Sequence, residues 1–228
     1  MQPLLSANLA TYAARVGLMR PTLESLVGQF DLLRVWLNDC EPPGWADEFP
    51  RVVWHRGPDR TDAGKFGFIP QGGEYYCTCD DDIIYPPDYA ERIREECDAV
   101  GPVVSFHGRY FDRFPIRSIY KGHTRAHRCT WAGERLPLTI PGSGVACIDT
   151  NRVRLDIADD PPKMADVHLA IACHKAGVVP MLGRHPKGWI KLETLPGGIY
   201  KEKVRDDGDA VALINATFVG KCSMQNKR

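Results

Sequence analysis

The residues most able to do chemistry are three consecutive aspartates, Asp80, Asp81 and Asp82, which directly follow an apolar segment. Neighbouring carboxylates repel one another unless water or a cation screens them. Residues 74–79 have the composition of a buried strand, and open α/β sheets bind ligands at the carboxyl ends of their strands. Because carboxylate oxygens suit hard cations, the run predicts a site for Mg²⁺ or Mn²⁺. The alternative is a solvated acidic turn.

A second segment of chemical interest is 109–135, which is rich in arginine, histidine and aromatic residues and has no clean period. His123, His127 and Cys129 suggest zinc, but a fourth ligand at the usual spacing is missing. We expect a loop that faces the acceptor, basic enough to meet a phosphate or an acidic glycan, or a mobile lid. The glycines within 142–144 indicate either a plain turn or a backbone that approaches a donor sugar.

The elements that must position these residues alternate between strand-like and helix-like patterns, which is typical of an α/β fold. Strands are expected at 3–7, 32–37, 52–54, 74–79, 103–106, 145–148 and 178–182, and helices at 21–30, 88–98 and 164–176. We expect one domain over 1–228 with a mainly parallel central sheet flanked by helices. About 1–100 would form a nucleotide-binding half, about 101–200 an acceptor and catalytic half, and 221–228 a frayed tail.

The composition narrows the class of partner and compartment. Lysine and arginine number 29, and so do aspartate and glutamate, so no overall field attracts nucleic acid or a membrane surface. The eight cysteines form no pair of CxxC motifs, and in a chain of this length they indicate reduced core thiols. Residues 1–19 lack the basic start of a signal peptide, and no stretch is long enough to cross a bilayer. We expect a cytoplasmic protein with no transmembrane segment.

Several motifs together carry a resemblance to a known family. The segment 80–89, Asp-Asp-Asp-Ile-Ile-Tyr-Pro-Pro-Asp-Tyr, resembles the DxD region of GT-A-fold, family-2-like glycosyltransferases. Residues 7–12 with Arg15, the segment 62–66 and the segment 164–168 are similar to further parts of that family, so the likeness runs from about residue 4 to 190. It implies a GT-A-like domain and a metal-dependent, inverting hexosyltransferase. The reaction would move a hexose or deoxyhexose from a nucleoside-diphosphate sugar, UDP-sugar favoured, to a hydroxyl acceptor in glycan synthesis.

The resemblance also implies roles for individual residues around the donor nucleotide: Thr11, Tyr12, Arg15, Asp39, Asp62, Lys65, Asp80 and Asp81. Arg15 would supply charge near the phosphates, and Asp39 would face the base or ribose. Asp62 and Lys65 would hold the base and diphosphate. An ordinary strand end at Thr11 and a plain turn at Asp39 remain open alternatives.

The metal and the catalytic base complete the implied site. Asp82 and Asp80 would ligate Mn²⁺ or Mg²⁺, with His185 completing the shell. Asp166 would act as general base and take the proton of the acceptor hydroxyl. The alternative for Asp166 is that its charge stabilises the N-terminus of its helix.

Two other functions fit a related fold. A sugar nucleotidyltransferase usually carries a glycine-rich, basic phosphate loop after the first strand, whereas this chain has no glycine in that place before Gly17. A non-catalytic module that binds nucleotide-sugars or glycans is the second alternative.

Overall fold

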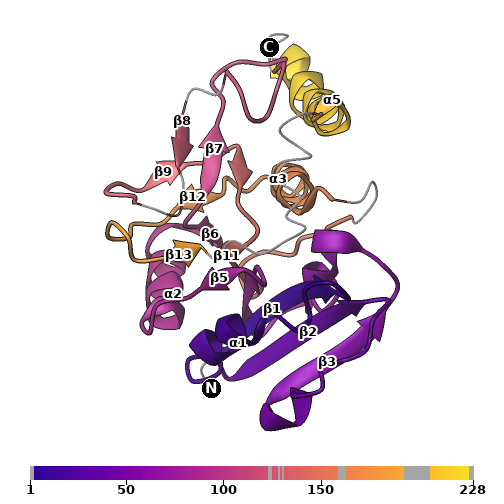
Figure 1. The fold of residues 1–228 in the computed structure, drawn as a ribbon. Coiled ribbons are helices and arrows are strands. Elements are labelled where there is room, and N and C mark those ends of the chain that lie inside the picture. Colours follow the sequence, from indigo (N-terminus) through magenta and orange to yellow (C-terminus); the bar gives the residue numbers. More distant parts are fainter. Residues whose placement is uncertain are drawn as a thin grey trace.

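The computed structural model describes residues 3–122, 125–127, 129, 131–158, 163–192 and 206–225. Within these residues the chain forms an α/β fold around an eight-stranded sheet with the order β3-β2-β1-β4-β11-β6-β12-β9 (Figure 1). This confirms the predicted fold class, including the helices that flank the sheet. His123, one of the three residues that suggested zinc, lies outside the described residues. So do the last three residues of the predicted frayed tail.

The first half of the chain supplies four parallel strands. They are β1 (Leu4–Tyr12), β2 (Leu32–Asn38), β3 (Val52–Gly57) and β4 (Glu74–Cys79), linked by α1 (Arg20–Leu26) and the short helices η1 (Ala46–Glu48) and η2 (Thr61–Phe66). Every residue of β4 is buried, as expected for a strand covered on both faces. Because these strands run in the same direction, their carboxyl ends lie on the same side of the sheet. The last residues of β1, β2 and β4 are Tyr12, Asn38 and Cys79.

The second half departs from the parallel pattern. Strand β11 (Val145–Asp149) is antiparallel to both of its neighbours, β4 and β6 (Val103–Ser105). Strand β12 (Met181–Leu182) is parallel to β6, and β9 (Leu136–Pro137) is antiparallel at the edge. Two smaller sheets are also present. One has the order β10-β7-β8 and consists of β10 (Ile140–Pro141), β7 (Gly108–Tyr110) and β8 (Arg125–His127). The other pairs β13 (Lys191–Leu192) with β5 (Ile83–Ile84). Segment 109–135 thus contributes most of β7 and all of β8 to an antiparallel sheet beside the main one.

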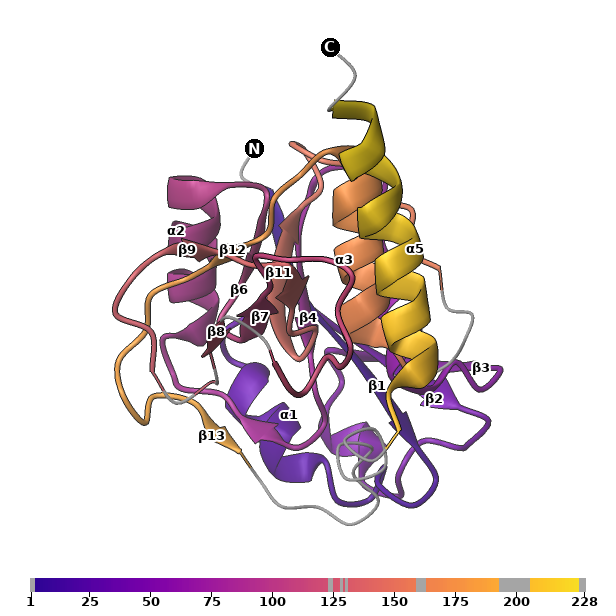
Figure 2. The same ribbon diagram turned by 90° about the horizontal axis from the view of Figure 1, so that it is seen from above.

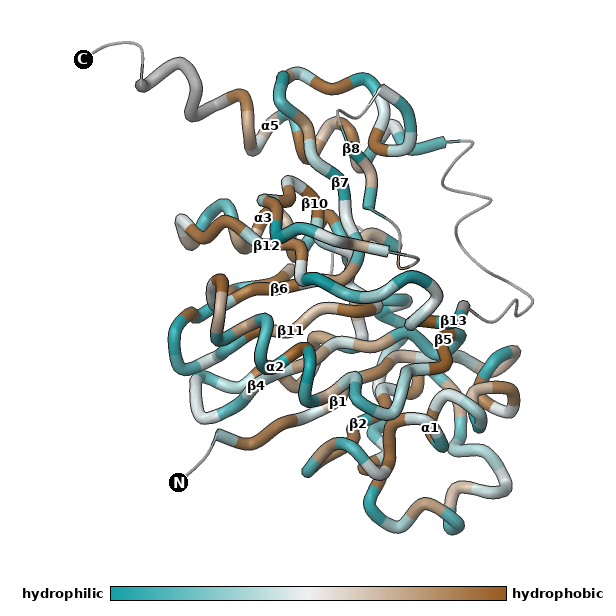
Figure 3. Tube along the Cα trace, turned by 90° about the vertical axis from the view of Figure 1, so that its left-hand side faces the viewer, coloured by the Kyte–Doolittle hydropathy of each residue, from teal (hydrophilic) through white to brown (hydrophobic). Residues whose placement is uncertain are grey.

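Helices cover both faces of the sheet. Figure 2 shows α2 (Tyr89–Val100) on one side and α3 (Ala165–Ala176) on the other, with α5 (Gly208–Gln225) outside α3. Alternate strand residues separate accordingly, so that Cys77 and Cys147 pack in the core with α2, whereas Tyr76 and Ile148 pack with α3. The colouring of Figure 3 shows apolar segments along β6 and β11 and polar connecting loops.

The C-terminal helix is a correction to the expected frayed tail. Helix α5 continues to Gln225, and its residues Ala210 and Ile214 are buried against α3. Its Asn215 side chain donates to the Ile116 carbonyl at 2.8 Å and accepts from the Ile116 amide at 2.7 Å. Helix α5 is therefore tied to the segment that follows β7.

Seven cysteines are buried free thiols, as the sequence predicted: Cys40, Cys77, Cys79, Cys97, Cys129, Cys147 and Cys173. Within the residues that the structure describes, no helix has both the length and the apolar character needed to span a bilayer.

A single indole ring lies under the loop that carries Lys65. A Cβ added at Gly57, Gly64 or Gly67 would come within 2.2, 2.5 and 2.7 Å of the Trp36 side chain. These glycines therefore let η2 and its flanks lie directly on the ring, which also donates its indole N–H to the Pro58 carbonyl at 3.1 Å.

Candidate active site

A cavity of about 810 Å³ lies at the carboxyl ends of β1, β2 and β4, as the sheet topology leads one to expect. It extends past the start of α3 to β7 and to the residues that precede α5. Of the residues predicted to bind the donor or the metal, eight line it: Thr11, Tyr12, Arg15, Asp62, Lys65, Asp80, Asp81 and Asp82. Asp166 lines it as well, from the first turn of α3.

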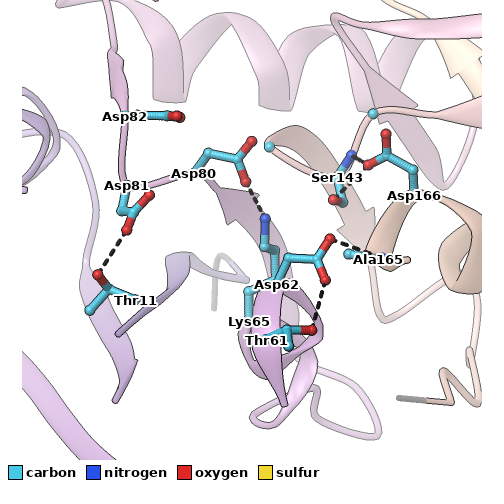
Figure 4. Close-up of polar contacts among 12 residues, drawn as sticks. Thr11, Thr61, Asp62, Lys65, Asp80, Asp81, Asp82, Ser143, Ala165 and Asp166 are labelled. Atoms are coloured by element: carbon cyan, nitrogen blue, oxygen red, sulfur yellow. Dashed lines mark hydrogen bonds and ion pairs between the residues drawn. The ribbon is translucent and has the colours of Figure 1, made fainter. Parts of the chain in front are cut away.

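Asp81 and Asp82 share one cation. The Arg15 guanidinium lies 2.8 Å from an Asp81 carboxylate oxygen and 2.7 Å from one of Asp82. Asp81 also accepts the Thr11 hydroxyl at 2.7 Å (Figure 4). Burial raises the pKa of Asp81 to about 6 in spite of these partners. Thr11 and Arg15 thus position the acidic run as well as facing the ligand space.

Lys65 supplies the second cation. Its side chain is 3% exposed, and its ammonium group pairs with the Asp80 carboxylate. Burial opposes the charge, but Asp80 and Asp62 raise the pKa of Lys65 above its ordinary value. Asp62 itself is held by the Ala165 amide at 3.2 Å and the Thr61 hydroxyl at 3.1 Å, and burial raises its pKa. Lys65 is therefore a buried ammonium group whose charged form is favoured by the carboxylates around it.

The position of Asp80 depends on a close backbone approach. A Cβ on Gly144 would lie 2.0 Å from Asp80 Oδ2, so only glycine leaves room for this carboxylate. Tyr85 joins the same two segments, because its hydroxyl accepts the Asp80 amide at 2.8 Å and donates to the Gly144 carbonyl at 2.7 Å. Sequence reasoning missed Tyr85, although Gly144 had been singled out as part of a glycine pair.

Asp166 is oriented by Ser143. The Ser143 amide and hydroxyl both donate to Asp166 Oδ1 at 2.7 Å. Both of these bonds use the same oxygen, which leaves Oδ2 available to a ligand (Figure 4). The first turn of α3 therefore presents a fixed carboxylate to the cavity.

Two predicted residues lie elsewhere. Asp39 is exposed, with φ of 45°, and its carboxylate accepts the Asp59 amide at 3.2 Å. Its neighbour Asn38 lines the cavity instead and bonds the Thr11 and Thr61 carbonyls at 3.0 and 2.9 Å. Successive residues at a strand end point to opposite sides, and this alternation was the signal that would have selected Asn38.

His185 lies outside the residues that line the cavity. It is 3% exposed, and its ring packs against Phe106 and Trp189, with ring centroids 5.4 and 5.9 Å away. Burial lowers its pKa. The structure therefore does not bring His185 together with the aspartates, and the predicted metal shell is reduced to Asp80 and Asp82.

Asp80 and Asp82 remain the candidate ligands for a divalent cation. Seven aspartates and four lysines or arginines line the cavity, an acidic excess that a cation would balance. Asp80 and Asp82 extend in the same direction (Figure 4) and are 41% and 31% exposed. Burial and the neighbouring Asp80 charge raise the pKa of Asp82. In the described part of the chain no three His, Cys, Asp or Glu side chains form a metal cage, so further ligands would come from substrate oxygens.

Comparisons with known proteins identify the fold. No protein-family model and no curated protein matches the chain. Among solved structures, the chain is similar to 4-diphosphocytidyl-2C-methyl-D-erythritol synthase at 13% identity, with a TM-score of 0.50, over 90% of this chain and 99% of that chain. The fold is GT-A-like. At this identity the likeness concerns the fold alone.

The same match corrects the predicted activity. The resemblance found in the sequence implied a hexosyltransferase, but the structural neighbour is named for making a diphosphocytidyl compound, which is nucleotidyl transfer. The glycosyltransferase prediction was wrong on this comparison. The short motifs that suggested it, at 80–89 and 62–66, contribute Asp80–Ile83, Asp62 and Lys65 to the cavity lining, and a fold by itself does not set the reaction.

Proposed function

We propose that the chain is a nucleotidyltransferase that joins a nucleoside monophosphate to the phosphate of a small phosphorylated alcohol or sugar. An oxygen of the acceptor phosphate would attack the α-phosphorus of a nucleoside triphosphate. The bond from that phosphorus to the bridging oxygen would break, and pyrophosphate would leave. Every atom of the two substrates is then found in the products.

The observation that carries this proposal is the pairing of buried cations with carboxylates in one cavity. Arg15 and Lys65 lie beside Asp80–Asp82 at the strand ends, where α/β folds hold nucleotides. A cavity of about 810 Å³ is within the usual range for small-molecule sites. The fold likeness to a diphosphocytidyl-forming enzyme supports the same reaction class.

The turn after β1 lacks the glycine-rich loop of many nucleotidyltransferases. Its residues carry Arg15, and η2 brings Lys65 to the same space. The positive charge for the triphosphate would therefore come from these two side chains. Lysine and arginine remain charged near neutral pH, so both would act as fixed charges on the phosphates and not as proton donors.

The carboxylates divide into two groups. Asp80 and Asp82 would hold Mg²⁺ or Mn²⁺, which when bound would neutralise charge on the phosphate oxygens. Asp166 would accept a hydrogen bond from the acceptor or take the proton of a singly protonated acceptor phosphate, whose second pKa is about 6. Thr11, Tyr12 and Asn38 would contact the nucleoside.

The test incubates the full chain with CTP, UTP, GTP or ATP, with Mg²⁺ or Mn²⁺, and with a phosphate monoester. Suitable acceptors are glycerol 3-phosphate, ribitol 5-phosphate and glucose 1-phosphate, each beside its phosphate-free counterpart. We expect metal-dependent pyrophosphate release and new diphosphate signals in ³¹P NMR. Release of nucleoside diphosphate from a nucleotide-sugar, with no pyrophosphate from any triphosphate, would refute the proposal. Nucleotide binding without turnover under all conditions would indicate a binding module.

A further inference from the structure

The cavity has a second end that differs from the aspartate-rich end. It lies between the small sheet β10-β7-β8, the segment after Ile116 and the start of α5. Its walls include the apolar side chains of Ile119, Cys129, Ile140 and Ala210. Arg109 and Tyr120 line this end as well. Arg109 therefore places a cation beside these apolar side chains.

Arg109 is held firmly by its backbone. It is the middle residue of β7, where it pairs with Ile140 of β10 and with Ala126 of β8. Its carbonyl accepts the Thr139 amide at 2.8 Å. The guanidinium carbon lies 4.8 Å from the centre of the Tyr120 ring, and the side chain is half-buried. No described carboxylate lies within ion-pair distance of it, so the guanidinium edge is available.

Tyr120 is in turn positioned by the C-terminal region. The Asp207 carboxylate accepts the Ser118 hydroxyl and the Ile119 amide, both at 2.7 Å. The Ser118 hydroxyl also accepts the Tyr120 amide at 3.1 Å. Asp207 lines the cavity, and its Oδ2 oxygen is engaged with Ser118 and Ile119. The residue before α5 therefore holds the backbone of the segment that carries the Tyr120 ring.

We propose that Arg109 binds the phosphate of the acceptor and that the carbon body of the acceptor lies against the apolar wall. A guanidinium stacked on a ring keeps its planar N–H edge free, and this edge matches two phosphate oxygens. The site would select a compact phosphate monoester over the free alcohol. That the bound phosphate ester is the acceptor substrate rests on the proposed nucleotidyl transfer. Its binding to Arg109 does not, and it can be measured separately.

The experiment is calorimetric titration of the full chain with glycerol 3-phosphate, with glycerol and with inorganic phosphate. We expect the wild-type protein to bind glycerol 3-phosphate and not glycerol. Arg109→Gln should weaken this binding by about 10-fold to 100-fold, the range for a charge-assisted hydrogen-bonding pair. Arg109→Lys should lie between, because it keeps the charge and loses the two-pronged contact. Tyr120→Leu and Asp207→Asn should each weaken binding without abolishing it.

Arg117→Gln is the matched control, since Arg117 is an exposed arginine in the same segment and lies outside the cavity lining. Thermal unfolding of each variant separates lost binding from lost folding. Equal affinity of Arg109→Gln and wild type would overturn the assignment, and so would wild-type binding that does not depend on the phosphate. Phosphate-ester binding without any pyrophosphate release would instead sink nucleotidyl transfer and leave Arg109 as a phosphate site. Where turnover is observed, Arg109→Gln should raise the KM for the acceptor and leave the KM for the triphosphate unchanged.

Discussion

Gly144→Ala tests whether the position of Asp80 governs the reaction. The new methyl group would lie 2.0 Å from Asp80 Oδ2, whereas ordinary contacts begin at 3.4 Å, so the carboxylate must move by about 1.4 Å. The atom that clashes is the end of a side chain that is 41% exposed, so water can replace part of its ion pair with Lys65. We expect the free energy of unfolding to fall by only about 1 kcal/mol. A displacement of about 1 Å in a reacting site can cost about 100-fold in rate, and we expect pyrophosphate formation to fall by that factor.

The assay pairs initial rates of pyrophosphate release with urea unfolding of the same preparations. Gly28→Ala is the matched control, because a Cβ at Gly28 meets nothing within 4 Å. It should leave both quantities within error of the wild type. Activity of Gly144→Ala within threefold of wild type would show that the Asp80 geometry does not matter. A loss of stability above about 3 kcal/mol would show that the backbone, and not the carboxylate, absorbs the clash.

Three further predictions concern two residues of the site and one ion pair outside it, between Glu96 and Arg135. Lys65→Met should lower the free energy of unfolding at pH 7 by about 2–3 kcal/mol, because Asp62 is left buried without a cation beside it. Adding Asp80→Asn to this variant should not restore the lost stability. Full recovery in the double variant would mean that Asp80, and not Asp62, was the carboxylate destabilised by the loss of Lys65. Asp166→Asn should keep triphosphate binding and lose about 100-fold in transfer, measured by titration and by pyrophosphate release; near-normal turnover would remove Asp166 from the mechanism. Burial opposes ionisation of Glu96, but the hydrogen bonds from Arg135 lower its pKa, so Glu96→Gln should cost about 1 kcal/mol at pH 7. That difference should persist down to the ordinary glutamate pKa and vanish as the pH falls through the lowered folded value; a constant difference in urea unfolding down to pH 2 would contradict the ion pair.

The strands and the acidic run were predictable because their signals are local. Residues 75–79 are aromatic or small without interruption, and the burial of β4 on both faces explains that pattern. Helix α3 was marked by its acidic first turn and by Gly177, which takes the left-handed conformation at its end. The antiparallel β11 could not be read in the same way, since a buried strand has the same composition in either direction.

Other features depend on contacts between distant segments. Helix α5 contains two valines, an isoleucine and two glycines, which are weak helix formers, so its packing on α3 decides its structure. The His185 ring is placed by Phe106, which lies 79 positions earlier in the chain. The pairing of Tyr120 with Arg109 requires the fold of β7 and its neighbouring segments. Contacts between such distant residues leave no signal in a short sequence motif, so they could not be predicted from one.

The indole of Trp36 acts as a spacer whose thickness sets how far the Lys65 ammonium stands from the sheet. The three positions without a Cβ that rest on it, Gly57, Gly64 and Gly67, come from two different segments. A smaller residue at Trp36 would leave a gap under the loop, and a larger residue at any of the glycines would lift it. The position of the Lys65 charge thus depends on Trp36, which is itself uncharged. A redesign that moves the Lys65 ammonium group would have to begin at Trp36.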